Sequence, residues 1–366
     1  MRQLRLFLTL CLFFCQLYTQ QSYYLEFPTG TYSIVARDSL TGDLGVGVQS
    51  KFLAVGAVVP YAKAGVGAVA TQAFANTTFG PDGLDLLEQG KTAQDAVEIL
   101  IQQDTAANRR QLGIVDAQGN AYAFTGAGCN PYAGHIIGKG YTVQGNILAG
   151  EEVLKAMSRM FEITPGDLAE KILSALEAAE KAGGDRRGKQ SAALLVVREG
   201  GGYGGFNDRF IDIRVDDDSL PLAELRRIYK LWQTTYLYSA RMRSIDTFNK
   251  NKKFMAAEEE KRRLVGDLND QLRSNPDDPV LLNQIAWILA TNEIDRERAL
   301  ELSKRAVKLV PGNSTFLSTM AECHYRLGNF DTAIAIGSEL IAKEPANDQF
   351  WKQLQKFKEA KQQGYR

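Results

Sequence analysis

The sequence predicts an α+β domain, in which two antiparallel sheets stack face to face under covering helices, followed by an all-α repeat domain. Strand-like segments between residues 31 and 215 occur in clusters that are separated by helix-like segments. Clustered strands favour stacked antiparallel sheets over a doubly wound parallel sheet, in which strands and helices alternate one by one. Residues 275–366 instead carry a repeat of about 34 residues, which is typical of paired helices.

The first 30 residues precede the predicted domain. A short basic start, Met1–Arg5, is followed by an almost wholly apolar run from Leu6 to Leu17. That run is too short to span a bilayer comfortably and is typical of a secretory signal. We therefore expect a signal peptide over residues 1–20, a leader or propeptide over residues 21–30, and export to the periplasm or the cell exterior. An uncleaved N-terminal membrane anchor is the alternative.

The first strands are predicted from alternation. Apolar and other residues alternate with period two in Thr31–Arg37, which indicates a strand. The turn residues of Asp38–Asp43 separate it from a second strand at Leu44–Ser50, so the two are expected to form a hairpin. Two more strands are expected at Ala54–Pro60 and Val66–Gln72.

Helices and further strands follow. Thr92 and Asp95 form a capping box that opens a helix over Ala93–Gln103, and Thr164–Asp167 reads as a second box that starts a long helix ending at Gly183. The glycine-rich segment of residues 125–145 is expected to be a loop that lines a cleft. The other expected elements are helices at Gly83–Glu88 and Glu151–Met160, and strands at Gln111–Asp116, Tyr122–Phe124, Ser191–Arg198 and Arg209–Val215.

The remainder of the chain is helical in pattern. Pro221 opens an amphipathic helix that is expected to pack back on the sheets, so the first domain is assigned residues 31–235. The highly charged residues 250–273 predict a solvated helix within a helical linker of residues 236–274.

A repeat marks the last domain, residues 275–366. Pro276, Pro311 and Pro345 are 35 and 34 residues apart, and each precedes a helical unit. This period is that of tetratricopeptide repeats. Arrays of this kind bind proteins or peptides in their concave face, so we expect a protein partner there.

Composition narrows the chemistry. Lys plus Arg and Asp plus Glu both number 43, so the net charge is zero and nothing favours nucleic acid as a partner. The two histidines, His135 and His324, do not complete a zinc site or a Ser-His-Asp triad. No metal or cofactor is therefore implied. Cys129 and Cys323 lie in different predicted domains and are expected to be free thiols.

Thr31 fits a hydrolytic design that needs no histidine. A threonine that becomes the first residue of a mature chain carries its own base, because the free α-amine lies beside the hydroxyl. The unperturbed pKa of such an amine is about 7.7–8.0, so a useful fraction is neutral at physiological pH. The alternative is that Thr31 merely opens a β-strand.

Several motifs of the first domain resemble one known family. They are Thr31–Asp38, Gly45–Lys51, Ala54–Pro60, Gly65–Gln72, Arg110–Asp116 and Gln144–Asn146. From Thr31 to roughly Leu231 the chain is similar to a bacterial family of unassigned function, domain of unknown function 1028, which is related to the N-terminal nucleophile (Ntn) hydrolases.

This resemblance implies a four-layer αββα sandwich, but it supplies no substrate, because the family has no settled one. We expect hydrolysis of a C–N bond in a small amide or peptide-like substrate. The resemblance also implies that Thr31 is the nucleophile and that its own amine is the base. The bond between Gly30 and Thr31 must then be cut, either by the chain itself or by a host protease. Gly30 suits self-cleavage, because a residue without Cβ tolerates the strained geometry of an acyl shift.

Other residues are expected to assist Thr31. Lys51 ends the second strand and is expected to lower the pKa of the amine by like charge, with a surface lysine as the alternative. Asn146 is expected to donate a hydrogen bond to an oxyanion, with a turn-capping asparagine as the alternative. The expected substrate-binding residues are polar and lie on or at the ends of strands or in the glycine-rich segment: Ser33, Arg37, Asp38, Gln72, Asn130 and His135. A structural role is the alternative for His135.

The sequence therefore predicts an exported Ntn-type amidohydrolase joined to a protein-docking repeat module. Two other functions stay open: an inactive Ntn-like scaffold whose repeats recruit a partner, and a module that binds a small molecule or a cell-wall fragment. The sequence does not fix the oligomeric state, and a homodimer is compatible with it.

Overall fold

The computed structural model describes residues 30–364, and the chain divides after Tyr236 into two compact units. The predicted signal peptide, the rest of the leader and the alternative membrane anchor lie outside the described residues. Within residues 30–364, no helix has both the length and the apolar character needed to cross a membrane.

The N-terminal unit contains two antiparallel sheets. The larger has the strand order β10-β9-β2-β1-β8-β7, and the smaller has the order β3-β4-β5-β6. The strands are β1 (Thr31–Arg37), β2 (Leu44–Ser50), β3 (Pro60–Lys63), β4 (Gly67–Ala73), β5 (Arg110–Asp116), β6 (Ala121–Thr125), β7 (Gly134–Gly138), β8 (Tyr141–Asn146), β9 (Ser191–Val197) and β10 (Arg209–Val215).

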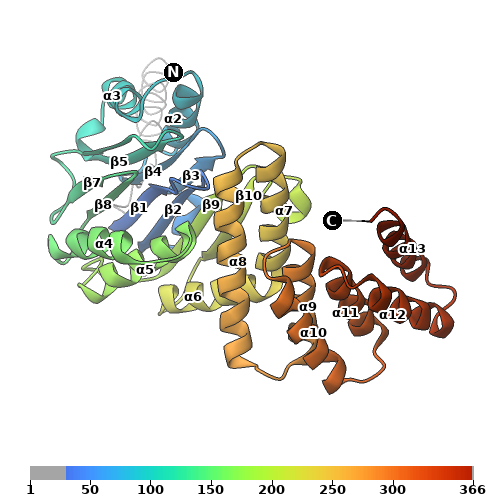
Figure 1. Ribbon diagram of the computed structural model, residues 1–366. Helices are drawn as coiled ribbons and strands as arrows, with labels where there is room; N and C mark the ends of the chain where they lie inside the picture. The colour runs from blue at the N-terminus through green and yellow to red at the C-terminus, as the bar shows by residue number, and fades with distance from the viewer. Residues whose placement is uncertain (1–29, 365–366) are drawn as a thin grey trace, which may run out of the picture. The chain divides into compact units, whose positions relative to one another are not determined.

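Helices cover both outer faces of the paired sheets. In Figure 1, α2 and α3 lie on one side of the sheets and α4 and α5 on the other. The helix α6 packs against β9 and β10. The five helices are α2 (Phe79–Glu88), α3 (Ala93–Gln103), α4 (Glu152–Ile163), α5 (Leu168–Lys181) and α6 (Pro221–Trp232). The predicted antiparallel sheets with covering helices are therefore confirmed.

The central strands β1 and β2 are buried on both faces. Val35, Val46 and Val48 point between the sheets, where they pack with residues of the smaller sheet such as Ala68 and Val115. The opposite face lies under α5. It admits the helix closely because Gly47 has no side chain, and a Cβ there would collide with Ile172. On the face that lies between the sheets, the polar residues at one end of β1 and β2 differ from this apolar packing.

Three sequence-based predictions are wrong. Residues 54–60 do not form a strand, because the backbone turns through a left-handed Ala54 (φ 52°) into the 3-10 helix Val55–Ala57. The long helix α5 is capped by Asp167, whose carboxylate accepts from the Glu170 N–H, whereas Thr164 ends α4. Part of the glycine-rich segment forms the hairpin of β7 and β8, whose pairing with β1 outweighs the low strand propensity of glycine.

The C-terminal unit is all helical. Its helices are α7 (Tyr238–Lys250), α8 (Phe254–Ser274), α9 (Pro279–Thr291), α10 (Arg296–Leu309), α11 (Ser314–Arg326), α12 (Phe330–Lys343) and α13 (Asp348–Gln362). The expected solvated connecting helix corresponds to α8, but its residues Leu264 and Leu268 pack into the same core as Leu282 and Ile285 of α9. A buried ion pair between Arg241 and Glu260 (2.8 Å) joins α7 to α8. The helices 238–274 therefore belong to the same folded unit as the repeats.

Candidate active site

A row of polar residues crosses the larger sheet at one end. Thr31 is paired with Asn146 of β8 on one side and with Ser50 of β2 on the other, and Ser50 is paired with Ser191 of β9. All four residues are buried. Directly paired residues of an antiparallel sheet share a face, and Thr31 shares its face with Val35, so the row points between the two sheets.

The peptide bond between Gly30 and Thr31 lies at the centre of this row. The Ser50 hydroxyl donates a hydrogen bond to the Gly30 carbonyl oxygen, and it accepts one from the Thr31 hydroxyl (Oγ1 to Oγ, 3.1 Å). The Arg187 guanidinium donates a second hydrogen bond to the same carbonyl (Nη2 to O, 2.7 Å). One serine hydroxyl thus links the threonine hydroxyl to the carbonyl that precedes it.

Asp185 holds Arg187 in place. Its carboxylate accepts from Arg187 Nε (3.1 Å) and Nη2 (2.7 Å), and its side chain is fully buried. It also accepts from the backbone N–H groups of Lys51 (3.0 Å) and Arg187 (2.9 Å). The guanidinium therefore reaches the Gly30 carbonyl from a fixed position.

A neutral network, here called the intersheet polar cluster, lies beside Thr31. It consists of Ser33, Gln72, Gln111, Gln144 and Asn146, all of which are buried. Gln72 accepts from Ser33 (2.6 Å) and donates to Gln111 Oε1 (2.8 Å), which also accepts from Asn146 (3.2 Å). Gln144 donates to the Ser33 hydroxyl (2.6 Å). Since the five side chains carry no charge, the cluster orients groups around Thr31 but offers no strong base.

The structure brings several predicted site residues together with Thr31. Asn146 is its strand partner, Ser33 lies two residues along the same strand, and Gln72 approaches the Thr31 carbonyl oxygen (3.4 Å). The Asn130 carbonyl accepts from the N–H of Ile147, the residue after Asn146, so this loop also lies at the Thr31 end of the sheet.

Other predicted residues lie farther from Thr31 or face solvent. The Lys51 side chain is exposed, although its backbone N–H binds Asp185. Arg37 and Asp38 are at the opposite end of β1, about 20 Å along the strand from Thr31, so the structure does not bring them together with it. The Asp38 carboxylate instead accepts from the backbone N–H groups of Leu40 and Thr41, as a turn residue does.

His135 lies on β7 rather than in a loop, directly opposite Gln144 of β8. Its Nδ1 is 2.9 Å from the Thr125 hydroxyl. Desolvation lowers the pKa of the imidazole, which favours the neutral ring at neutral pH. Thr125 also accepts from Gln111 (2.9 Å), so His135 is connected to the edge of the intersheet polar cluster.

Sequence reasoning missed the residues that hold the Gly30 carbonyl. Ser50 had a usable signal, because it ends the strand that was expected to pair with the strand of Thr31. Arg187 and Asp185 had none, since they lie in an irregular segment after α5, more than 150 residues from Thr31 along the chain. Gln111 was predicted only as the first residue of a strand, and Gln144 was identified only as part of the family motif Gln144–Asn146.

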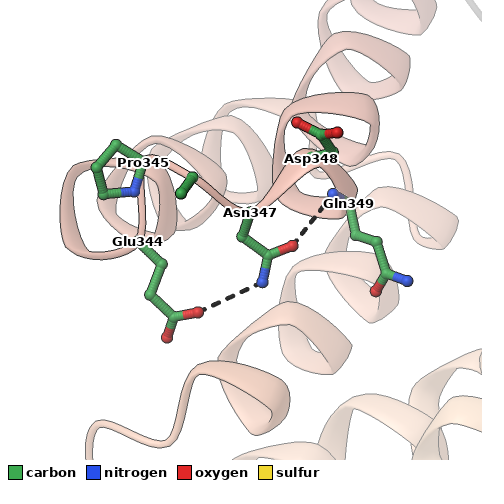
Figure 2. A pocket seen from close by; sticks show the side chains of 6 residues that line it. Glu344, Pro345, Asn347, Asp348 and Gln349 are labelled. Atoms are coloured by element: carbon green, nitrogen blue, oxygen red, sulfur yellow. Dashed lines mark hydrogen bonds between the residues drawn. The ribbon is translucent and has the colours of Figure 1, made fainter.

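Other features of the described residues are less suited to chemistry. A hollow in the C-terminal unit is lined by the six consecutive residues 344–349, which form the turn after α12 and the first two residues of α13 (Figure 2). Asn347 caps α13 there by accepting from the Gln349 N–H (3.1 Å), and it donates to Glu344 (3.4 Å). The polar groups of this hollow thus bind one another as an ordinary helix cap does, and they indicate no ligand site. Within residues 30–364, no three His, Cys, Asp or Glu side chains gather as a metal site would require.

The fold and the site define a two-sheet α/β domain with a threonine at the start of a central strand, followed along the chain by helical repeats. The chain belongs to the family of unknown function DUF1028, whose model matches residues 31–225. Residues 294–356 match a tetratricopeptide repeat model. Both resemblances stated from the sequence are thereby confirmed.

Solved structures agree with this membership. A crystal structure of a DUF1028 protein from Silicibacter pomeroyi is 32% identical, with a TM-score of 0.53, and the match covers 58% of this chain and 90% of that one. Two repeat structures are also similar. The second tetratricopeptide domain of human RPAP3, solved with an HSP70 peptide, is 18% identical (TM-score 0.25, 32% of this chain, 92% of that one). A repeat protein from Parabacteroides merdae is 15% identical (TM-score 0.27, 37% and 55%). No curated protein matches the chain.

Proposed function

We propose that the protein is an Ntn-type amidohydrolase in which Thr31, released as the N-terminal residue, attacks the carbonyl of an amide substrate. The observation that carries the proposal is the Ser50 hydroxyl, which bridges the Thr31 hydroxyl and the Gly30 carbonyl. A nucleophile, a proton carrier and a polarised carbonyl are thus joined at the bond whose cleavage would create the catalytic amine. The two outer helical layers and the two sheets also suit an Ntn-type sandwich.

The first reaction is cleavage of the chain by itself. Thr31 Oγ bonds to the Gly30 carbonyl carbon while its proton passes to Ser50 Oγ and the Ser50 proton passes to the carbonyl oxygen. The carbonyl then re-forms as the C–N bond breaks, and the Thr31 nitrogen takes up the proton. The product is an ester between Gly30 and the Thr31 oxygen. Water hydrolyses this ester, which leaves a carboxyl group on Gly30 and a free amine on Thr31.

Turnover of a substrate repeats the chemistry with the new amine as base. The amine accepts the Thr31 hydroxyl proton, the oxygen attacks the substrate carbonyl, and the leaving amine departs with that proton. Water then hydrolyses the acyl ester with help from the same amine. The intersheet polar cluster contains no group that titrates near neutral pH, which supports the amine as base. Asn146, paired with Thr31, is proposed to donate to the developing oxyanion.

The two ends of the chain support a cellular location and a partner for the enzyme. The apolar N-terminal segment supports export through a cleaved signal peptide, so the reaction would take place outside the cytoplasm. Tetratricopeptide repeats generally serve protein interaction, and the match over residues 294–356 supports a protein partner for the C-terminal unit.

The test is the N-terminal sequence and intact mass of the full chain and of its T31A and T31S variants after synthesis in an exporting host. The wild-type chain and T31S are expected to begin at residue 31, whereas T31A is expected to retain Gly30. If all of the chains keep Gly30, Thr31 has no amine and the hydrolase proposal fails. If T31A is cut as readily as the wild type, a host protease performs the cut and self-cleavage is refuted.

The mature chain should also show a particular pH dependence. Its amidase activity is expected to rise as the Thr31 amine loses its proton, with a midpoint near the usual pKa of an α-amine, about 7.7–8.0. Rates at saturating and subsaturating substrate between pH 5 and 9 would measure it. A rate that does not change across pH 7–8 would contradict the amine as base.

A further inference from the structure

We propose that Arg187 restricts the enzyme to acyl groups whose α-carbon carries no side chain, so that its substrates are glycyl-type amides. The inference rests on the proposed function and names the substrate class of that same site. Its starting point is Gly30, the acyl half of the bond beside Thr31. A Cβ added to Gly30 would lie 2.6–2.8 Å from Nη2, Nε and Cζ of Arg187, closer than carbon atoms approach such groups in proteins.

The Arg187 side chain is 31% exposed, so only its hydrogen bonds oppose a movement of the guanidinium that would admit a side chain. The guanidinium is held by two hydrogen bonds to Asp185, whose side chain is fully buried, and it also binds the Gly30 carbonyl. Hydrogen bonds between charged groups are among the strongest in proteins. Displacing Arg187 would leave a buried carboxylate without its charged partner, which is costly. The restriction on the acyl group therefore comes from a side chain that its hydrogen bonds hold in one position.

The same restriction should apply to substrates because one oxygen attacks both carbonyls. Self-cleavage and turnover each pass through an ester on Thr31 Oγ. The acyl carbon must therefore come within bonding distance of the same atom, where Ser50 and Arg187 can donate to its oxygen together with Asn146. The α-carbon of the substrate then lies close to where the Gly30 α-carbon lies, against Arg187.

A double-mutant cycle in the full chain tests the role of Arg187. G30A, R187A and the double variant are made by cell-free translation, and the rate of cleavage after residue 30 is followed by intact mass. Discrimination over one carbon in a pocket is typically about 10- to 200-fold, so G30A is expected to be cut at least about 10-fold more slowly than wild type. In the R187A background, the ratio of the cleavage rates without and with the G30A substitution should fall to near one.

Two further variants serve as a control and as a replacement in this cycle. R186A removes the neighbouring exposed arginine and should leave the preference for Gly30 unchanged. If R187A loses cleavage altogether, R187K replaces it, because lysine retains a donor but lacks the forked guanidinium that crowds Gly30. G30A cut at the wild-type rate, or equally slow cleavage of G30A with and without Arg187, overturns the inference. An uncut wild-type chain overturns the proposed self-cleavage as well, so the two failures are distinguishable.

Substrates added in solution complete the test. The probes are the 7-amino-4-methylcoumarin amides of acetylglycine and acetylalanine, and the protein is the processed full chain. Release of coumarin from the glycine amide is expected to be at least about 10-fold faster, and the preference should shrink in the Arg187 variant. Equal rates for the two amides, or a preference for alanine, would overturn the assignment of substrate class while leaving Thr31 as the nucleophile.

Discussion

Replacing Ser50 by alanine tests the bridge at the Gly30–Thr31 bond most directly. S50A removes one of the two hydrogen-bond donors to the Gly30 carbonyl and the acceptor of the Thr31 hydroxyl. The backbone of β2 needs no change, because alanine fits wherever serine does. The variant is therefore expected to fold with the Gly30 carbonyl bound by Arg187 alone.

The magnitude follows from the role of the lost donor. Removing one donor from a developing oxyanion typically costs about 2.7–4 kcal/mol, or about 10²–10³-fold in rate. Arg187 still donates to the same oxygen, and it carries a full charge. S50A also removes the proton acceptor of the Thr31 hydroxyl, so we expect a decrease of at least about 100-fold in the rate of cleavage after residue 30.

Cell-free translation followed by intact mass and N-terminal sequencing measures this rate without export enzymes. The matched control is S191A on β9. Ser191 is the strand partner of Ser50 and equally buried, but its hydroxyl donates to the Phe52 carbonyl and accepts from the Val55 N–H instead. S191A should be cleaved at close to the wild-type rate. Normal cleavage of S50A, or equal slowing in both variants, would refute a specific role for the Ser50 hydroxyl.

Three further predictions concern stability and reactivity. Q111L removes the acceptor of the buried Gln72 and Asn146 amide groups, and it should lower the free energy of unfolding by about 2–4 kcal/mol. Urea denaturation measures this loss, and an unchanged midpoint would contradict the prediction. Asp43 and Arg198 form a buried ion pair (2.5 Å), so D43L alone should cost about 3–5 kcal/mol and R198M should recover most of that loss in a double-mutant cycle. Burial raises the pKa of Cys129, and that of Cys323 to about 11, so iodoacetamide at pH 8 should modify both far more slowly in the folded than in the unfolded protein; equal rates would contradict this.

Elements with strong local signals were predicted almost to the residue. The strand Leu44–Ser50 and the helix Ala93–Gln103 have the predicted bounds, because alternation defines the first and a complete capping box defines the second. The predicted strand at residues 54–60 failed because its apolar residues are also compatible with a 3-10 turn. There, the Val55 N–H donates a hydrogen bond to Ser191 of a distant strand, a contact that the sequence pattern of residues 54–60 does not reveal.

The candidate site likewise contains one residue with a local sequence signal and others without one. Thr31 was predictable because its signal is local: a Gly-Thr bond at the start of an alternating strand, after an apolar leader. Arg187 follows a helix in a charged, glycine-rich stretch that carries no period. Its contact with Gly30 depends on how the segment after α5 returns to the end of the larger sheet, and no pattern within that segment specifies this return.

This dependence on distant segments has a consequence for when the Gly30–Thr31 bond can be cut. The two donors to the Gly30 carbonyl come from the end of β2 and from the segment between α5 and β9, so both are present only after the larger sheet has formed. An unfolded chain holds the same peptide bond without either donor, and its hydrolysis is not assisted. Cleavage is thereby coupled to folding, and a reactive N-terminal threonine arises only in a chain whose site has already been assembled around it.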